Sequence, residues 1–482
     1  MFDMRPVGYL VGLMVLAMSG TMLLPLLVDL AEGREHWTVF AESMIVTGLI
    51  GGLVALSCRN AIGQGLSIQQ AFLLTTTVWV VLPLFGALPF MLGETGLGLV
   101  DALFESMSGM TTTGSTVIAG LDGLPKGLLL WRSILQWLGG LGIVIVALVF
   151  LPEMRVGGMQ FFRSEGFDTL GKALPRTIDI SKGVLNVYLV VTLACTFAYL
   201  ALGMGVFDAT AHALTTVATG GFSTRDASFG AYSAGLQYAC ILFMILSTLP
   251  FVRLMQGMQG QMRPLWQDSQ VRTYLRWIGY ASILIVGYEV AVTGYIDEEG
   301  LRARLFNMVS IFSGTGFGDG DVTAWGSFPF VILIAVGAIG GCTGSTGCSI
   351  KIFRYQLMLR ALGQQARRIF HPSSVMVLRH EGRRVEDEVL QSVMLLFTVY
   401  ILSLGIFSVA LELTGLTLIE SVSGAWTAIF NIGPAFGPSV GATGSLQAFP
   451  DAAKGLMILA MLMGRLEILA VLVLLLPRFW RP

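Results

Sequence analysis

The stretch MTTTGSTV, residues 110–117, places five hydroxyl side chains around one glycine in a chain that is 54% hydrophobic. It belongs to a pattern that occurs four times, in DALFESMSGMTTTGST (101–116), DATAHALTTVATGGFS (208–223), RARLFNMVSIFSGTGFG (302–318) and ESVSGAWTAIFNIGPAFG (420–437). The four stretches align on Gly114, Gly221, Gly316 and Gly433, and six residues before these glycines stand Ser108, Thr215, Ser310 and Thr427. Self-similarity of this kind predicts one structural unit repeated four times.

The composition is typical of a protein embedded in a membrane. Only 12% of the 482 residues are charged, against about 25% in soluble proteins. Apolar runs long enough to cross a ~30 Å hydrocarbon core recur along the chain, and because they are continuous they favour helices over a barrel. We predict an all-α polytopic membrane protein with ten transmembrane helices, near residues 7–29, 38–57, 69–92, 127–151, 184–204, 232–252, 275–295, 326–350, 389–411 and 452–477.

The basic residues indicate the orientation of these helices. With the N-terminus inside, 21 of the 29 lysines and arginines fall in cytoplasmic segments, so the positive-inside rule predicts that both termini are cytoplasmic. The first apolar run is longer than the ~7–15-residue core of a signal peptide, and we expect it to be retained as a helix. The five cysteines are too scattered for a disulfide scaffold or a zinc site. The lipid bilayer is an expected partner, and a net charge of −1 gives no reason to expect nucleic acid.

Each aligned stretch lies on the outer side, between two spans, and is too short and polar to cross the membrane. A half-length re-entrant helix followed by a loop is tolerated at membrane depth where it lines a water-filled pathway. Glycine lets backbone carbonyls turn toward an axis, and rings of carbonyls replace the hydration shell of the ion in K⁺ filters. We therefore predict four re-entrant pore helices within four repeats of outer helix, pore helix and inner helix (M1-P-M2), in a pseudo-fourfold arrangement around one pore.

The predicted organisation assigns every part of the chain to this plan. Residues 1–62 form two extra N-terminal transmembrane helices, and the four repeats span 63–160, 161–262, 263–360 and 361–482, with an interrupted inner helix at 335–350 in the third. The residues expected to bind K⁺ at the selectivity filter are Thr112, Thr113, Gly114, Thr219, Gly220, Gly221, Gly314, Thr315, Gly316, Asn431, Ile432 and Gly433.

The same loops resemble those of a known family. TTTGST, TGGFST, SGTGFGDGD and FNIGPAFGPSVG are similar, in order, to the four filter loops of the Trk/Ktr/HKT superfamily of potassium transporters, and the resemblance covers the whole chain. The two extra N-terminal spans are similar to the bacterial TrkH/TrkG branch. The resemblance implies uptake of K⁺ across the bacterial inner membrane, a homodimer, a cytoplasmic TrkA-type subunit whose RCK domains bind nucleotide, and no organic cofactor. Because Gly114 stands where Na⁺-favouring plant relatives have serine, it also implies selectivity for K⁺.

A glycine-rich run inside the eighth span predicts a gate. AVGAIGGCTGSTGCSIKIF (335–353) has five glycines within eleven residues, and each costs about 1 kcal/mol relative to alanine in a helix. We expect a loop below the filter rather than a continuous helix; close helix packing through small residues is the alternative. The candidate gate residues are Gly340, Gly341, Gly344, Gly347 and Arg465.

Arg465 lies in the apolar span AMLMGRLEIL, and charges within the membrane face a partner or a cavity. We expect Arg465 to reach carbonyl groups of the interrupted span and to hold the loop closed, with pairing to Glu467 or another buried acid as the alternative.

Two other functions can be weighed against a K⁺ channel. A proton- or sodium-coupled K⁺ symporter on the same fold would need a titratable group within the membrane, and Glu289, Glu412 and Glu467 are the few acidic candidates. An intramembrane enzyme would need a nucleophile and base or a metal cluster, which histidines at 36, 212, 371 and 380 do not supply. We therefore predict that the chain is not an enzyme, and keep coupled symport as the alternative.

Overall fold

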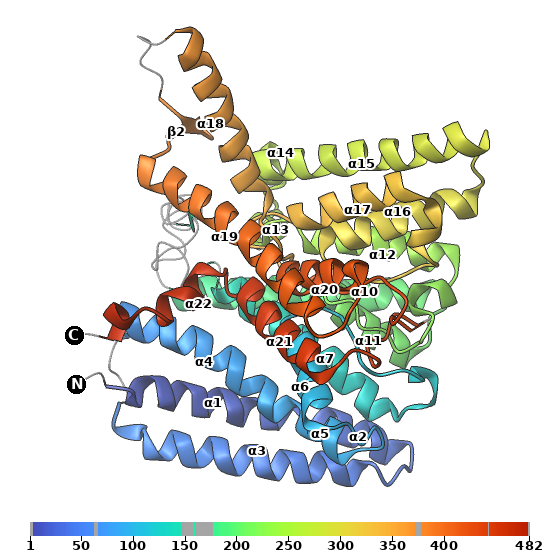
Figure 1. Ribbon diagram of the computed structural model, residues 1–482. Helices are drawn as coiled ribbons and strands as arrows, with labels where there is room; N and C mark the ends of the chain where they lie inside the picture. The colour runs from blue at the N-terminus through green and yellow to red at the C-terminus, as the bar shows by residue number, and fades with distance from the viewer. Residues whose placement is uncertain are drawn as a thin grey trace.

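The computed structural model describes residues 3–61, 66–146, 148, 158–159, 177–371, 377–441 and 443–480. These residues are almost wholly helical; the only sheet among them is an antiparallel pair of two-residue strands, β1 (Arg379–His380) and β2 (Arg383–Arg384). Long helices cross the width of Figure 1, and both termini lie at the same side. The prediction of an all-α membrane protein is confirmed.

The chain begins with a pair of spans formed by α1 (Arg5–Thr21) with α2 (Leu23–Ala31), and by α3 (Trp37–Ser57). Glycines let α1 and α3 approach closely: a methyl group on Gly12 would lie 2.6 Å from the backbone nitrogen of Ala55, and one on Gly51 would lie 2.8 Å from that of Leu16. Small residues permit this kind of contact between helices in lipid.

Four groups of helices follow, each with a first span, a short middle helix of 12 to 16 residues and an inner helix. They are α4 (Ile68–Gly86) with α5 (Leu88–Leu92), α6 (Leu99–Met110) and α7 (Lys126–Ile145); α10 (Thr177–Ala201), α11 (Val206–Val217) and α12 (Ala234–Ser247); α15 (Ser269–Thr293), α16 (Glu298–Ser313) and α17 (Ser327–Ile339); and α19 (Asp387–Glu412), α20 (Leu418–Phe430) and α21 (Asp451–Arg465). The predicted boundary between the first two repeats, at residues 160 and 161, lies outside the described residues.

The remaining described elements lie before these groups, within them, between them or after the last one. They are the helices α13 (Phe251–Met258), α14 (Arg263–Gln267), α18 (Ile352–Phe370) and α22 (Leu469–Leu474), and the 3-10 turns η1 (Arg59–Ala61), η2 (Leu121–Gly123), η6 (Ser228–Ala231), η7 (Val322–Trp325) and η8 (Pro477–Trp480). Of these, α18 projects away from the rest of the molecule in Figure 1.

Fewer than ten helices of the described part have the length and apolarity of a straight membrane crossing. In the described part, seven spans are long and apolar enough to cross a membrane, and the bent pair of α12 and α13 would make eight. With 13 and 15 residues, α17 and α21 are shorter than the ~20 that a straight crossing needs. Both are short because the chain leaves the helix within the apolar run, after Ile339 and after Arg465.

The span predicted near residues 232–252 is not one straight helix. The axis turns by 104° between α12 and α13. At the turn, Thr248 O accepts a hydrogen bond from Cys342 N (3.0 Å), and Phe251 N donates to Gly344 O (2.9 Å). Pro250, between them, has no N–H to continue a helix. The helix therefore ends where its backbone pairs with the glycine-rich segment of the third repeat.

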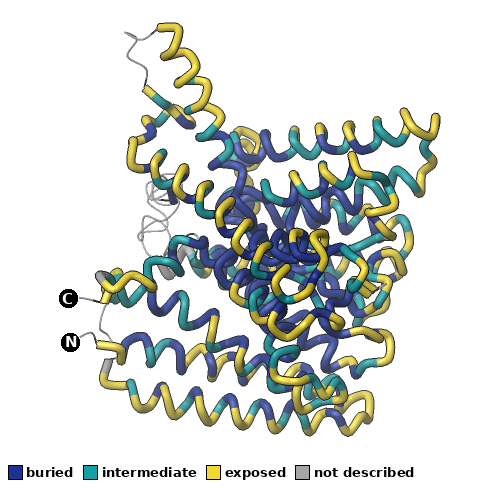
Figure 2. Tube along the Cα trace, viewed as in Figure 1, coloured by how far each residue is buried: buried dark blue, intermediate teal, exposed yellow. Residues whose placement is uncertain are grey.

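Burial is deepest at the centre of the molecule, around the ends of the four short helices (Figure 2). The outer faces of α3 and α15 instead expose large apolar side chains such as Leu53 and Ile283. Apolar side chains on the outside suit contact with lipid, whereas the buried centre is rich in threonine and serine. The fold thus surrounds a polar centre with apolar helices.

Candidate functional site

The four short helices end in the same local structure. The backbone N–H just before each aligned glycine donates to the carbonyl five residues earlier: Thr113 to Ser108 (2.9 Å), Gly220 to Thr215 (2.9 Å), Thr315 to Ser310 (2.9 Å) and Ile432 to Thr427 (3.1 Å). The residue two before each glycine has a left-handed φ: 53° at Thr112, 52° at Thr219, 72° at Gly314 and 52° at Asn431. The register found by aligning the glycines is therefore also the register of the backbone.

The aligned glycines join the four loops into a ring. All have positive φ, from 79° at Gly221 to 118° at Gly433. A methyl group on any of them would come within 3.0 Å of a carbonyl oxygen of another loop: Gly114 meets Gly220 O, Gly221 meets Thr315 O, Gly316 meets Ile432 O, and Gly433 meets Thr113 O. Each loop thus contacts the next one along the chain, and the fourth contacts the first.

This ring brings together all twelve residues predicted for the filter. Gly114, Gly221 and Gly316 are half-buried and the other nine are buried. The four pore helices end at the ring, and the C-terminal end of a helix carries partial negative charge. Together with the loop carbonyls, these ends make the centre of the ring a place that favours a cation.

The first turns of the pore helices have the opposite polarity and hold acidic residues. These are Asp101 in α6, Asp208 in α11, Glu298 and Glu299 in α16, and Glu420 in α20. The sequence alignment places Ala303 rather than an acid in the third repeat, but α16 begins earlier than the alignment implies. All four helices therefore have acidic residues at the positive end.

Different side chains support each loop from its own pore helix. Nine residues before the glycine, Glu105 accepts from Val117 N (3.0 Å), His212 Nε2 lies 2.9 Å from Ser223 Oγ, and Asn307 accepts from Asp319 N (3.1 Å). The fourth repeat has Gly424 at this position, and the adjacent Ser423 accepts from Phe436 N (2.9 Å). The ring is therefore fourfold in its backbone and not in its side chains.

Comparison with known proteins identifies the family. A family model described as TrkH, cation transport protein, matches residues 36–481. The chain belongs to the TrkH family. It is 38% identical to the Trk system potassium uptake protein TrkI of Halomonas elongata, over 99% of this chain and 97% of that protein, and 32% identical to the Trk system potassium uptake protein TrkH of Escherichia coli K12, over 99% of each.

The fold of a solved TrkH-family structure is also the same. The crystal structure of the potassium transporter TrkH from Vibrio parahaemolyticus matches with a TM-score of 0.90 and 31% identity, covering 100% of both chains. The resemblance inferred from the loop sequences is confirmed, and the chain belongs with transporters rather than enzymes.

The glycine-rich segment of this TrkH-family chain, residues 340–351, lies buried against the ends of the pore helices. Cys348 Sγ is 3.9 Å from Thr112 Oγ1, and Ser349 Oγ donates to Phe430 O (3.2 Å). Gly340 and Gly344 have φ of 76° and 72°. Methyl groups on Gly341 and Gly347 would lie 2.9 and 3.1 Å from the side chain of Thr248. The four candidate gate glycines therefore belong to one non-helical segment next to the ring.

Arg465 contacts that segment, although not in the predicted way. Its Nη1 donates to the sulfur of Cys348, and its Nη2 donates to Gly139 O in α7 (3.0 Å). The expectation that Arg465 reaches carbonyls of the interrupted span is wrong, because that span offers it a cysteine side chain. Pairing with Glu467 does not occur either: α21 ends at Arg465, and Glu467, with a φ of 58°, pairs with Arg354 of α18.

Three buried polar residues near the ring were not predicted as site residues. Arg132, in the apolar run LLLWRSILQW, is 1% exposed and pairs with Glu105, which is fully buried; Gln136, in the same run, contacts the second loop. The positive-inside count treats Arg132 as one more residue outside the cytoplasm. Arg465 was selected because it is a basic residue within an apolar run. The same criterion applied to LLLWRSILQW would have identified Arg132.

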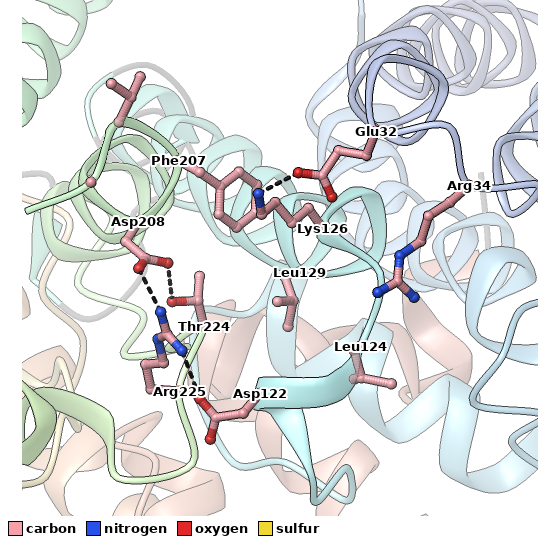
Figure 3. Close-up of a pocket in the computed structure, with 12 residues that line it drawn as sticks. Glu32, Arg34, Asp122, Leu124, Lys126, Leu129, Phe207, Asp208, Thr224 and Arg225 are labelled. Carbon is pink, nitrogen blue, oxygen red and sulfur yellow. Dashed lines mark hydrogen bonds and ion pairs between the residues drawn. The ribbon is translucent and has the colours of Figure 1, made fainter.

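A pocket of about 540 Å³ lies at the outer rim of the second loop, away from the ring (Figure 3). Arg225 there lies between Asp122 (3.0 Å) and Asp208 (3.2 Å), and Lys126 pairs with Glu32. The hydrogen bond that Arg225 donates to Asp122 raises the pKa of the Arg225 guanidinium above its usual range. Because these acids are already paired with basic groups, the pocket does not offer a cation the free carboxylates that it would need.

The inner helices of the first and fourth repeats pack on the pore-helix ends through glycine. A methyl group on Gly139 would come within 3.0 Å of Met110 O, and one on Gly464 within 3.0 Å of Ile429 O. Met110 and Ile429 both stand four residues before the aligned glycine. Space at these two glycines is therefore required for the pore helices to reach the ring.

This packing gives a prediction about stability. Gly139→Ala should destabilise the protein by about 1–3 kcal/mol, the usual cost of overpacking, and lower the thermal unfolding midpoint in detergent. Gly142→Ala, one turn further along α7, is the control, because its methyl group would lie 3.6 Å from the Trp79 ring. The control should be neutral or stabilising by up to about 1 kcal/mol; equal midpoints for the two variants would contradict the packing.

Proposed function

We propose that this chain is a potassium uptake protein that conducts K⁺ through the ring of four loops. The observation that carries the proposal is the closure of the ring, in which the carbonyl oxygens of Thr113, Gly220, Thr315 and Ile432 each lie against the glycine of an adjacent loop. Carbonyl rings substitute for the hydration shell of K⁺. Relatives along the full length of the chain are named potassium uptake proteins, which supports K⁺ as the ion.

In this proposal the segment 340–351 and Arg465 form the gate. The segment is buried against the pore-helix ends, where it blocks an ion leaving the ring. The Arg465 guanidinium is buried next to it, and a positive charge there repels a cation. Opening then requires the segment and Arg465 to move apart.

The proposed setting is the bacterial inner membrane, with both termini in the cytoplasm, a homodimer, and a cytoplasmic TrkA-type nucleotide-binding subunit that controls the gate. The distribution of basic residues supports this orientation. The projecting helix α18 carries Arg360, Arg367 and Arg368 on an exposed stretch that is continuous with the gate segment. A subunit docked on α18 could therefore move the gate directly.

Flux of ⁸⁶Rb⁺ or K⁺ into proteoliposomes tests the proposal, with and without a pH gradient and with Na⁺ as competitor. The purified chain and an Arg465→Ala variant are compared, so that a closed gate is not mistaken for absence of a pathway. Flux that follows the K⁺ gradient and ignores pH is the expected result. Absence of K⁺ flux in both proteins would contradict the proposal.

Uphill flux driven by a proton or sodium gradient would instead support the coupled symporter. Coupling would need a titratable acid within the membrane that is not already paired with a basic group. Glu289 instead pairs with Arg304 (2.6 Å), Glu467 pairs with Arg354, and Glu412 is exposed. These contacts favour the channel.

A further inference from the structure

Helix α7 contacts two neighbouring filter loops at once. It follows the first loop in the chain and packs against the pore helices α6 and α11 (Figure 1). Arg132 and Gln136 stand four residues apart on this helix, so both project from one face, and they are 1% and 0% exposed. No charged residue occurs in α12 or α17, the corresponding helices of the second and third repeats. In α21, the corresponding helix of the fourth repeat, Lys454 pairs with Asp101 and Arg465 donates to Cys348 and Gly139, so neither makes the contact with two filter loops that Arg132 makes.

The Arg132 guanidinium joins three segments of chain. Its Nε donates to Glu105 Oε1 (2.8 Å), its Nη1 to the carbonyl of Ser223 (2.9 Å), and its Nη2 to Thr116 Oγ1 (3.1 Å). Ser223 lies two residues after the glycine of the second loop, and Thr116 two residues after the glycine of the first. The Phe222 ring lies 4.1 Å from the guanidinium carbon. One fixed fork of donors thus holds the outer ends of both loops, as a planar guanidinium is suited to do.

Glu105 holds the first loop to the same group. Its carboxylate accepts from Thr116 Oγ1 and from Val117 N, each at 3.0 Å, in addition to Arg132. The carboxylate and the guanidinium are both buried, and burial of such a pair requires that all its hydrogen bonds be satisfied. The pair therefore has one favoured geometry. That geometry also fixes the spacing between the first and second loops.

Gln136 takes the place of a side chain that the second loop lacks. The residue before the aligned glycine is Thr113, Thr315 or Ile432 in three loops, but Gly220 in the second. A methyl group on Gly220 would come within 3.0 Å of Gln136 Cδ. The Gln136 amide donates to Gly220 O (2.6 Å) and accepts from Phe222 N (3.1 Å). Gln136, a side chain of the first repeat, therefore holds in place the carbonyl group that the second loop contributes to the ring.

We propose that Glu105, Arg132 and Gln136 are positioning residues that hold the second filter loop against the first and thereby set the discrimination of the ring between K⁺ and Na⁺. The inference rests on the proposed function, since it assigns a role in selectivity to groups that touch the ring from behind. It predicts that these side chains control which ion passes, although none of them lies in the ring itself.

The experiment measures K⁺ and Na⁺ flux in proteoliposomes for Gln136→Leu, Arg132→Lys, Glu105→Gln and the double variant Glu105→Gln/Arg132→Gln, all in the Arg465→Ala background. We expect Gln136→Leu and Arg132→Lys each to lower the K⁺-over-Na⁺ flux ratio by about fivefold or more, the factor that corresponds to one net hydrogen bond. The double variant should lower the ratio no further than Glu105→Gln alone, because the pair acts as one unit.

Controls separate positioning from stability. Arg304→Gln removes an ion pair, with side chains 14% and 19% exposed, that joins α16 to α15 rather than one loop to another, and its flux ratio should equal that of the background protein. Gln136→Leu leaves no unpaired charge, so its flux ratio tests the inference even if the Arg132 variants do not fold. Unchanged flux ratios in folded Gln136→Leu and Arg132→Lys would overturn the inference. Absence of K⁺ flux in the background protein would instead overturn the proposed function, and the role in selectivity with it.

Discussion

Gly114→Ser should lower the K⁺-over-Na⁺ flux ratio by at least about tenfold, equivalent to ~1.4 kcal/mol of difference between the two ions. The Cβ atom would come within 3.0 Å of Gly220 O, a backbone atom that cannot move aside alone. The φ of 87° at Gly114 is also unfavourable for any residue with a side chain. The ring must therefore widen between the first two loops, and a widened ring no longer holds carbonyls at the distance that dehydrated K⁺ requires.

Gly203→Ser is the matched control for backbone strain. Gly203 has a φ of 93°, and a Cβ atom there would meet nothing within 4 Å. It shares the strained backbone of Gly114 without the contact to another loop, so its flux ratio should equal that of the unmodified protein. An equal loss in both variants would mean that strain in the chain, and not the closure of the ring, accounts for the effect.

Arg465→Ala should raise K⁺ flux by at least about tenfold when no partner subunit is present. At an effective dielectric of ~20, a unit charge ~8 Å from K⁺ costs about 2 kcal/mol, and the substitution removes this barrier. It also removes the hydrogen bond to Gly139 O and the contact with Cys348 that tie the gate segment to α7. Flux into proteoliposomes along a K⁺ gradient measures the change.

Two further variants separate the charge from the contacts. Arg465→Lys keeps the positive charge and loses the fork of donors, and Cys348→Ala removes one contact and keeps Arg465 intact. If the charge forms the barrier, both should remain close to the unmodified protein in flux. If Arg465→Ala leaves K⁺ flux unchanged, Arg465 is not part of the gate.

The features that sequence predicts best here are local or periodic. Continuous apolar runs predict membrane helices because lipid leaves the backbone no other partner. The four loops align because each has a glycine with positive φ and a serine or threonine six residues before it. Gly114 and Gly433 could be placed at equivalent positions for this reason, although the contact between Gly433 and Thr113 O that closes the ring depends on tertiary structure.

Sequence predicts less where a residue acts on a distant part of the chain. The break after Ser247 depends on Cys342 and Gly344, about ninety residues later. Arg465 is conspicuous in an apolar run, but its partner Gly139 lies in the first repeat, more than three hundred residues away. Gln136 has no local signal, because a glutamine within an apolar run becomes meaningful only beside a loop that has glycine at position 220.

The most direct test of the central claim is the position of Rb⁺ in crystals of this protein, located by its anomalous scattering. If the four loops form one cation site, Rb⁺ should lie on the axis of the ring, among the carbonyl oxygens of Thr113, Gly220, Thr315 and Ile432. The peak should be lost from crystals of Gly114→Ser grown under the same conditions. Ordered Rb⁺ elsewhere in the molecule, with none in the ring at saturating concentration, would contradict the account.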